Sequence, residues 1–253
     1  MKVYFELGLA DTNPAKCFTT QHMLLPLLPS FERVDRLEDA EKLVFLDFGH
    51  TNYNHKADLC QKAKHLQLKV IVTTFDPANF QGITLLESSK LVDHVIVFDK
   101  KYLPSFRHCS FSDYWLNANL FPPEAPVSKD RVCVFGNLEN GRVLPPNIDK
   151  IDVDRPDLVD LYKRVQQYYG VLVFDSGRLE GQIIHHNKAK ALEALMCGRN
   201  AYCKAAIKSP TYSQFYLPFD EFNATRDINI PLNEIKKLNS HTINTFCETI
   251  QNI

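Results

Sequence analysis

Short apolar runs alternate with helix-like segments along this chain, and that alternation limits its possible folds more than any other feature. Runs rich in Val, Ile and Phe, each about the length of a buried strand, occur at residues 2–7, 43–48, 69–75 and 94–98. The segment 53–67 between the second and third runs has the length and composition of an amphipathic helix. Strands separated by helices of that length imply βαβ crossovers and a parallel sheet. The first half is therefore predicted to be α/β.

The alternation breaks at residues 115–129, where three prolines fall within five residues, and then restarts. A Pro-rich break between two regular halves predicts a linker between domains. Gly198, at the end of a strongly helical run, predicts the stop of a helix. In this second half we predict strands at 131–135, 170–175 and 200–204, and helices at 158–169, 188–197 and 233–253.

The predicted architecture is two Rossmann-like α/β domains that face each other across a cleft. The first domain is placed at residues 1–120, the linker at 121–128 and the second domain at 129–253. We expect that the final helix, about 240–253, can pack back onto the first domain. No internal repeat and no low-complexity tract interrupts either half.

Composition excludes several classes of protein. With 29 Lys and Arg against 30 Asp and Glu, the net charge of −1 argues against a protein that coats nucleic acid or an anionic membrane, although it permits a local basic groove. No apolar run approaches the roughly 18–20 residues that span a bilayer, so we expect a cytoplasmic protein without a membrane partner. The seven cysteines are widely spaced without a Cys-x-x-Cys pair, which favours reduced thiols over disulfides or structural zinc.

The sequence also disfavours a metal site and a dinucleotide-binding site. His50, His55 and Asp58 form a cluster that could suggest a metal site, but their spacing does not suit one helix face, and no metal is expected. No Gly-x-Gly-x-x-Gly occurs anywhere in the chain, which disfavours an oxidoreductase that binds a dinucleotide.

Residues 185–198, HHNKAKALEALMCG, carry the most informative polar pattern. An apolar stripe occupies one side of the predicted helix, and Lys190 and Glu193 lie three residues apart on another side. One interpretation is an ordinary ion pair on the surface. The other is a carboxylate near a helix start that accepts the two hydroxyls of a ribose, with Lys190 or the helix N-terminus facing phosphates.

Gly136, Asn137 and Arg142 follow a predicted strand. A glycine turn at the end of a strand lets backbone N–H groups approach a pyrophosphate, and an arginine adds a bidentate charge. The alternative is an ordinary turn with an exposed arginine.

The run KALEALMCG, residues 190–198, resembles the K-x-x-E-A-x-A-x-G signature in the C-terminal domain of GT-B glycosyltransferases. Two more segments, 94–121 and 131–142, resemble the end of the N-terminal domain and the opening of the C-terminal domain in the same family. The second of these, together with Asp76-Pro77, is similar to the spore-maturation-type branch. The resemblance extends over residues 43–253 in order and spacing.

The resemblance implies a function and a donor site in the second domain. Glu193 would hold the ribose of a nucleotide-sugar of UDP-sugar type, and Arg142 with Lys188 or Lys190 would clamp its diphosphate. The nucleotide-sugar is then a substrate, and no tightly bound cofactor is expected. His185 occupies the position where many retaining members carry a second glutamate, which contacts the transferred sugar.

Candidate catalytic residues lie in the first, acceptor-side domain. Asp47, His50 and Asp76 lie at or just beyond the carboxyl ends of predicted strands, the edge where open α/β sheets bind ligands. His50 or Asp47 is positioned to take the proton of an acceptor hydroxyl as general base. The alternative is that these residues cap a helix or stabilise a turn.

The acceptor that we favour is hydroxymethylated cytosine in double-stranded DNA, because this compact, glycine-poor chain resembles phage-encoded enzymes. Lys100, Lys101 and Arg107 would face the DNA phosphates, with a flipped base entering the cleft. These cations also suit an ordinary solvated surface. Polysaccharide or lipid-linked acceptors are the main alternative, and a catalytically silent nucleotide-sugar-binding module is the rival function.

Overall fold

The computed structural model describes residues 1–7, 19–46, 48, 53–74, 79–135, 144, 147–151, 157–173, 182–204, 207–224 and 226–253, with side chains left out at 182–187. Within these residues the strands form one sheet of six strands and one of five, and all strand pairs are parallel. The chain divides into two compact units, Met1–Asp113 with His241–Ile253, and Tyr114–Ser240. The predicted α/β class with parallel sheets is confirmed.

The first unit is a parallel sheet in the order β2-β1-β3-β4-β5-β6. Helices α1 and α2 connect β3 to β4 and β4 to β5, so they are the crossovers of two βαβ units. The strands are β1 (Lys2–Glu6), β2 (Glu32–Arg33), β3 (Lys42–Phe45), β4 (Lys69–Thr74), β5 (His94–Val97) and β6 (Cys109–Phe111), and the helices are α1 (Tyr53–His65) and α2 (Phe80–Ser88).

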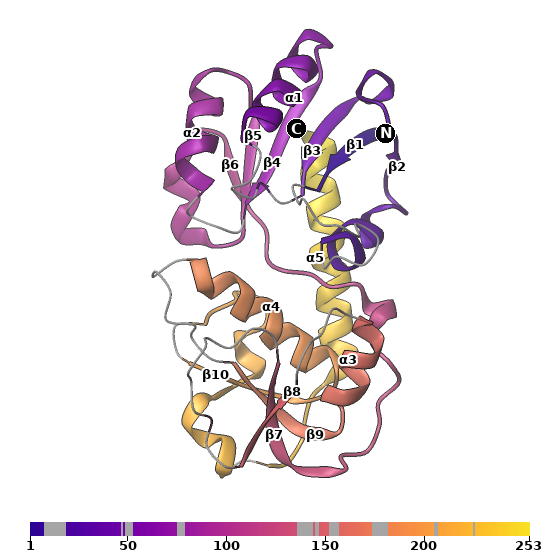
Figure 1. The fold of residues 1–253 in the computed structure, drawn as a ribbon, viewed down its shortest axis with the longest axis vertical. Helices are drawn as coiled ribbons and strands as arrows, with labels where there is room; N and C mark the ends of the chain where they lie inside the picture. Colours follow the sequence, from indigo (N-terminus) through magenta and orange to yellow (C-terminus); the bar gives the residue numbers. More distant parts are fainter. Residues whose placement is uncertain are drawn as a thin grey trace. The chain divides into compact units, whose positions relative to one another are not determined.

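One face of this sheet carries the core beneath α1 and α2, which Figure 1 shows over the same sheet. Alternate residues of the central strands point to that face, as the two-residue period of a strand requires. They are Leu43, Phe45, Val70, Val72, Val95 and Val97.

The last turns of α5 (Leu232–Asn252) belong to the first unit. The Lys42 ammonium donates hydrogen bonds to the carbonyl oxygens of Ile250 at 2.6 Å and Gln251 at 3.0 Å. Because the last carbonyls of a helix have no partner within the helix, this lysine caps the C-terminus of α5 from a strand of the sheet.

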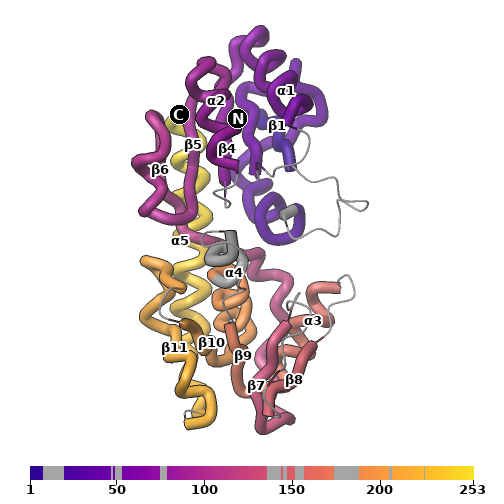
Figure 2. The backbone as a smooth tube through the Cα atoms, turned by 60° about the vertical axis from the view of Figure 1, so that its left-hand side comes forward, coloured from indigo at the N-terminus to yellow at the C-terminus, as the bar shows by residue number. Residues whose placement is uncertain are grey.

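The second unit has the sheet order β11-β10-β9-β7-β8, which Figure 2 shows from one side to the other. When read from β8 to β11, its five strands follow the same order as the first five strands of the first unit, the 2-1-3-4-5 order of a doubly wound, Rossmann-like sheet. The elements are β7 (Lys129–Phe135), β8 (Ile148–Ile151), α3 (Leu158–Val165), β9 (Tyr168–Val173), α4 (Gln182–Met196), β10 (Asn200–Cys203) and β11 (Tyr216–Pro218).

Two glycines are required by the packing of this unit. Gly198 has φ +68° just after α4, as predicted for a helix stop. At Gly170 in β9, a Cβ would lie 2.4 Å from the ring of Tyr202 and 3.1 Å from the carbonyl oxygen of Asn200, so only glycine leaves room for that ring.

Arg199 forms hydrogen bonds with the backbone at the ends of both α3 and α4. The residue is 1% exposed, and its guanidinium donates to the carbonyl oxygens of Gln166 at 2.6 Å, Gly198 at 2.7 Å and Ala125. One buried side chain therefore satisfies carbonyls at two helix ends and in the Pro-rich segment, which fixes where α3 stops.

Some predicted boundaries were wrong. The helix predicted at 158–169 ends at Val165, and the chain enters β9 at Tyr168. α4 begins at Gln182, earlier than the predicted residue 188, and α2 was not predicted. The short strands β2, β6, β8 and β11 were also missed, because their two to four residues form no strong apolar run.

Candidate functional site

Each sheet contains a switch point, a place where the chain changes direction across the sheet. β1 lies beside β3 in the first sheet, and β7 lies beside β9 in the second, although another strand separates each pair in the sequence. In doubly wound sheets in general, right-handed crossovers place the connections that follow two such strands on opposite faces, which opens a crevice at the carboxyl ends. Doubly wound sheets bind ligands in this crevice.

Six of the predicted site residues follow strands at or beside these switch points in the chain. The strands β7 and β9 bound the switch point of the second sheet, and β1 and β3 bound that of the first. Gly136, Asn137 and Arg142 come after β7, Asp47 and His50 after β3, and Asp76 after β4, and all six lie outside the described residues. Their roles stay predictions.

α4 follows β9 and carries the remaining donor-side candidates. Lys188 is buried, Lys190 is partly buried and Glu193 is 5% exposed. His185 belongs to α4 by its backbone, and its side chain lies outside the described residues. The interpretation of Lys190 and Glu193 as an exposed surface pair was wrong, because Glu193 is buried and Lys190 is partly buried.

Glu193 forms a buried hydrogen bond with the neighbouring helix α3. The hydroxyl of Tyr162 donates to its Oε1 at 2.7 Å, and the ring of Tyr162 stacks on Phe121 with centroids 4.3 Å apart. Burial raises the pKa of Glu193 to about 7, while the bond from Tyr162 and the charge of Lys190 act to lower it. Burial lowers the pKa of Lys190 against the opposing effect of Glu193. This carboxyl can take up or release a proton near neutral pH.

The early start of α4 changes the position of Glu193 relative to the sheet edge. At about 1.5 Å per residue, Glu193 lies roughly 16 Å along the axis from Gln182, and Lys188 about 9 Å. A ligand at the carboxyl ends of β7 and β9 therefore meets the first turns of α4 and Lys188 before it meets Glu193. The described contacts of Glu193 hold α4 against α3.

The three predicted acceptor-side cations are not brought together. Lys100 and Lys101 follow the carboxyl end of β5, and their ammonium groups lie 5.2 Å and 4.7 Å from the ring centroids of Phe111 and Tyr102. Arg107 precedes β6 at the amino-end edge, where its backbone N–H donates to Glu87 at 2.9 Å. Between Lys101 and Arg107 the chain runs from the carboxyl ends of the strands back to their amino ends. The sequence did not predict this crossover, because the strand that follows it, β6, has only three residues.

Lys56 is a candidate that the sequence analysis missed. It is 1% exposed in the first turn of α1, and its ammonium lies 4.7 Å from the ring centroid of Phe48, just after β3. A buried cation is costly and is therefore a marker of functional sites. The sequence does indicate that Lys56 is buried, because it begins the i, i+4, i+7 stripe of α1 that continues with Cys60 and Ala63.

Among the residues that the structure describes, no three His, Cys, Asp or Glu side chains are grouped so as to hold a metal ion. The described cysteines are free, and burial raises the thiol pKa of Cys60 to about 12 and of Cys109 to about 11, which makes both poor nucleophiles. No described helix is both long and apolar enough to cross a membrane.

A comparison with known protein families found no match to this chain, and neither did a comparison with curated proteins.

Proposed function

We propose that this protein is a glycosyltransferase that moves a sugar from a nucleotide-sugar, of UDP-sugar type, to a hydroxyl acceptor. The observation that carries the proposal is the strand order of the second unit, in which β7 and β9 are neighbours. Such a switch point is where doubly wound sheets hold nucleotides. The residues predicted to bind phosphate, Gly136, Asn137 and Arg142, directly follow β7 in the chain.

The proposed donor site has a defined electrostatic task. Glycosyl transfer leaves a nucleoside diphosphate, whose growing charge must be neutralised as the sugar departs. Backbone N–H groups at Gly136 and Asn137 with the fork of Arg142 suit that task, and Lys188 in the second turn of α4 supplies a further cation. Glu193 supports the proposal through the hydrogen bond that it accepts from Tyr162, which holds α4, the helix that carries Lys188, against α3.

The first test is nucleotide binding by titration calorimetry. UDP should bind, and Arg142→Ala should weaken it about tenfold or more, as expected for the loss of a charged hydrogen-bonding partner. The matched control is Lys163→Ala, which removes an exposed cation from α3 and should leave the affinity unchanged. Absence of saturable binding of any nucleoside diphosphate contradicts the proposal.

Ribose recognition by Glu193 is tested separately with UDP and 2′-deoxy-UDP. If the carboxylate holds the ribose, as the resemblance implies, Glu193→Gln reduces affinity for UDP more than for its deoxy analogue. If it acts only by holding α4, Glu193→Gln and Tyr162→Phe weaken both ligands equally.

Turnover distinguishes the enzyme from a silent binding module. Slow release of UDP from a UDP-sugar in water, accelerated by a hydroxyl acceptor, is expected of a transferase alone. Hydroxymethylcytosine-containing DNA is the acceptor to examine first, with unmodified DNA of the same sequence as control. Nucleotide binding without any UDP release would favour the silent module.

A further inference from the structure

β6 is an edge strand of the first sheet, and two titratable side chains from other elements hold it there. Among the described strands it pairs with β5 alone, over three residues. The carboxylate of Glu87, 7% exposed at the end of α2, accepts from the N–H groups of Arg107 at 2.9 Å and His108 at 3.0 Å, just before β6. At the start of β5, His94 Nε2 lies at hydrogen-bond distance, 2.9 Å, from Ser110 Oγ in β6. A strand this short depends on such bonds for its place in the sheet.

A cavity of about 480 Å³ gives solvent access to this cluster. The charged and titratable residues of its lining are Lys69, Glu87, Lys90, Asp93, Arg107 and His108. Asp93 is ion-paired with Lys64 and accepts from the N–H of Val70 at 2.7 Å. Cys109, in β6 itself, stays a neutral thiol because burial raises its pKa to about 11. Of the residue types in this cluster, histidine is the one that ordinarily titrates between about pH 5 and 8.

The surroundings of His94 disfavour its protonated form. The side chain is partly buried between β5 and β6. Burial lowers the pKa of His94, the nearby His108 lowers it further, and Glu87 opposes both effects. Because the folded pKa lies below the ordinary 6.5, the stability that neutral His94 provides is complete above pH 6.5 and is lost as the pH falls toward the folded pKa. Mild acid therefore weakens the attachment of β6.

We propose that the contact between His94 and Ser110 is a pH-sensitive contact, in which protonation of His94 releases β6 from β5 while the other strands of the first sheet stay paired. When His94 and His108 both carry a proton, their charges repel, and release exposes both rings to water. The chain passes to the second unit at Tyr114, soon after β6 ends at Phe111. Release of β6 therefore lengthens the unpaired chain between β5 and the second unit. The contact does not depend on the nucleotide site proposed above.

Amide hydrogen exchange of the whole protein at pH 7.5 and pH 5, expressed as protection factors, tests the proposal. The N–H of Val95 donates to the carbonyl oxygen of His108 at 2.8 Å, and the N–H of Ser112 donates to that of Val97 at 3.0 Å. Both amides therefore report the pairing of β5 with β6, and their protection should fall several-fold at pH 5. The amides of β4 should keep their protection. Unchanged protection of Val95 and Ser112, or an equal fall throughout the first sheet, overturns the proposal.

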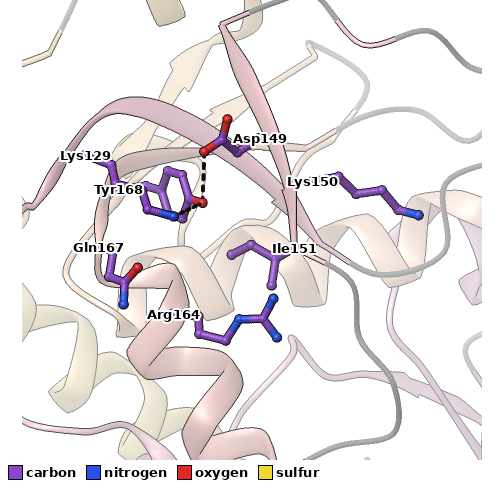
Figure 3. Close-up of a pocket in the computed structure, with 7 residues that line it drawn as sticks. All are labelled: Lys129, Asp149, Lys150, Ile151, Arg164, Gln167 and Tyr168. Carbon is purple, nitrogen blue, oxygen red and sulfur yellow. Dashed lines mark hydrogen bonds between the residues drawn. The ribbon is translucent and has the colours of Figure 1, made fainter.

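β8, at the edge of the second sheet, is the internal control. Its Asp149 accepts from the hydroxyl of Tyr168 at 3.1 Å, as Figure 3 shows, and from Arg131 at 3.1 Å. No histidine takes part in these bonds, so the protection of β8 should be the same at both pH values. A fall in β8 as large as that in β6 would indicate a general effect of acid and would also overturn the proposal.

Three variants connect the effect to His94. His94→Gln keeps a hydrogen-bonding side chain but cannot take up a proton, so the fall in protection at pH 5 should be much smaller. His108→Gln, at an exposed position, should reduce the fall in part, and it decides the question if His94→Gln does not fold. His65→Gln, at the exposed end of α1, is the matched control and should keep the whole effect.

Each variant is compared with itself at the two pH values, so a constant loss of stability cancels. A full acid effect in both His94→Gln and His108→Gln overturns the assignment to this contact.

Discussion

Glu193 shows at the scale of one residue how burial sets a property that sequence does not reveal. Its helical spacing from Lys190 suits an exposed ion pair as well as a buried carboxyl, and only the packing of α3 against α4 distinguishes them. Tyr162, which provides the hydrogen bond, lies far from Glu193 in the sequence and carries no motif. The candidate residues of α4 could therefore be named from the sequence, but their partners could not.

The raised pKa of Glu193 predicts a pH-dependent stability. Its folded pKa of about 7 lies above the ordinary 4.5, so its stabilising contribution is complete below pH 4.5 and is lost as the pH rises through 7. Glu193→Gln cannot ionise and should lack this loss. The unfolding free energy of the wild type relative to Glu193→Gln should fall by on the order of 3 kcal/mol between pH 4.5 and 8.

Denaturant unfolding across that pH range measures the difference. Glu221→Gln, which changes an exposed glutamate of the same unit, is the matched control for the loss of one carboxylate. A difference between the wild type and Glu193→Gln that does not vary with pH would contradict the raised pKa.

At the scale of elements, strands with a strong apolar run were predicted and weak ones were not. β1, β3, β4, β5, β7, β9 and β10 each correspond to a predicted strand within a few residues. The misplaced end of α3 has a tertiary cause, because no glycine or proline marks the stop and Arg199 binds the carbonyl of Gln166 from another part of the chain. Local pattern cannot record a partner that distant.

The end of α1 predicts a stabilising substitution. Gln67 adopts φ 59°, and the N–H of Leu68 bonds to the carbonyl of Ala63 at 2.9 Å, a helix stop that glycine makes without strain. Gln67→Gly should raise the unfolding free energy by about 1 kcal/mol. Gln61→Gly, at an exposed position inside the same helix, should lower it by about 1 kcal/mol. Thermal denaturation compares the two, and destabilisation by both variants would contradict the argument.

At the scale of the whole molecule, α5 contributes to both compact units. Within the second unit, the carboxamide of Asn239 bonds to both backbone groups of Leu116 at 2.8 Å. Beyond Ser240 the helix belongs to the first unit, where Phe246 and Ile250 are fully buried. The core of the first unit is therefore completed only by the last residues of the chain, although its sheet is finished at Phe111.

Truncation after Ser240 should then affect the two units differently. Removal of Phe246 and Ile250 leaves their buried sites in the first unit unfilled, at several kcal/mol for each large side chain. Amide hydrogen exchange should show β3 and β4 losing protection while β7 and β9 keep theirs. A matched truncation after Gln251, which removes residues 252–253, should change neither. Equal protection of both sheets in the Ser240 truncation would contradict this dependence.

The catalytic hypothesis belongs to the same scale, because it assigns the donor to one unit and the proton acceptor to the other. His50 follows β3 at the switch point of the first sheet, and an imidazole with an ordinary pKa near 6.5 accepts protons at neutral pH. His50→Ala should bind UDP normally and lose roughly 10²–10⁴ in turnover of a UDP-sugar. His65→Ala, at the exposed end of α1, is the matched control and should keep full turnover.

Two more variants decide between mechanisms. If Asp47 orients His50 or is itself the base, Asp47→Asn should also lose turnover without losing UDP, and Asp76→Asn tests the neighbouring strand end in the same way. In a reaction that retains configuration, the departing phosphate can take the proton, and no side-chain base is required. Near-normal turnover in His50→Ala, Asp47→Asn and Asp76→Asn together would exclude a base in the first unit and favour the leaving-group mechanism.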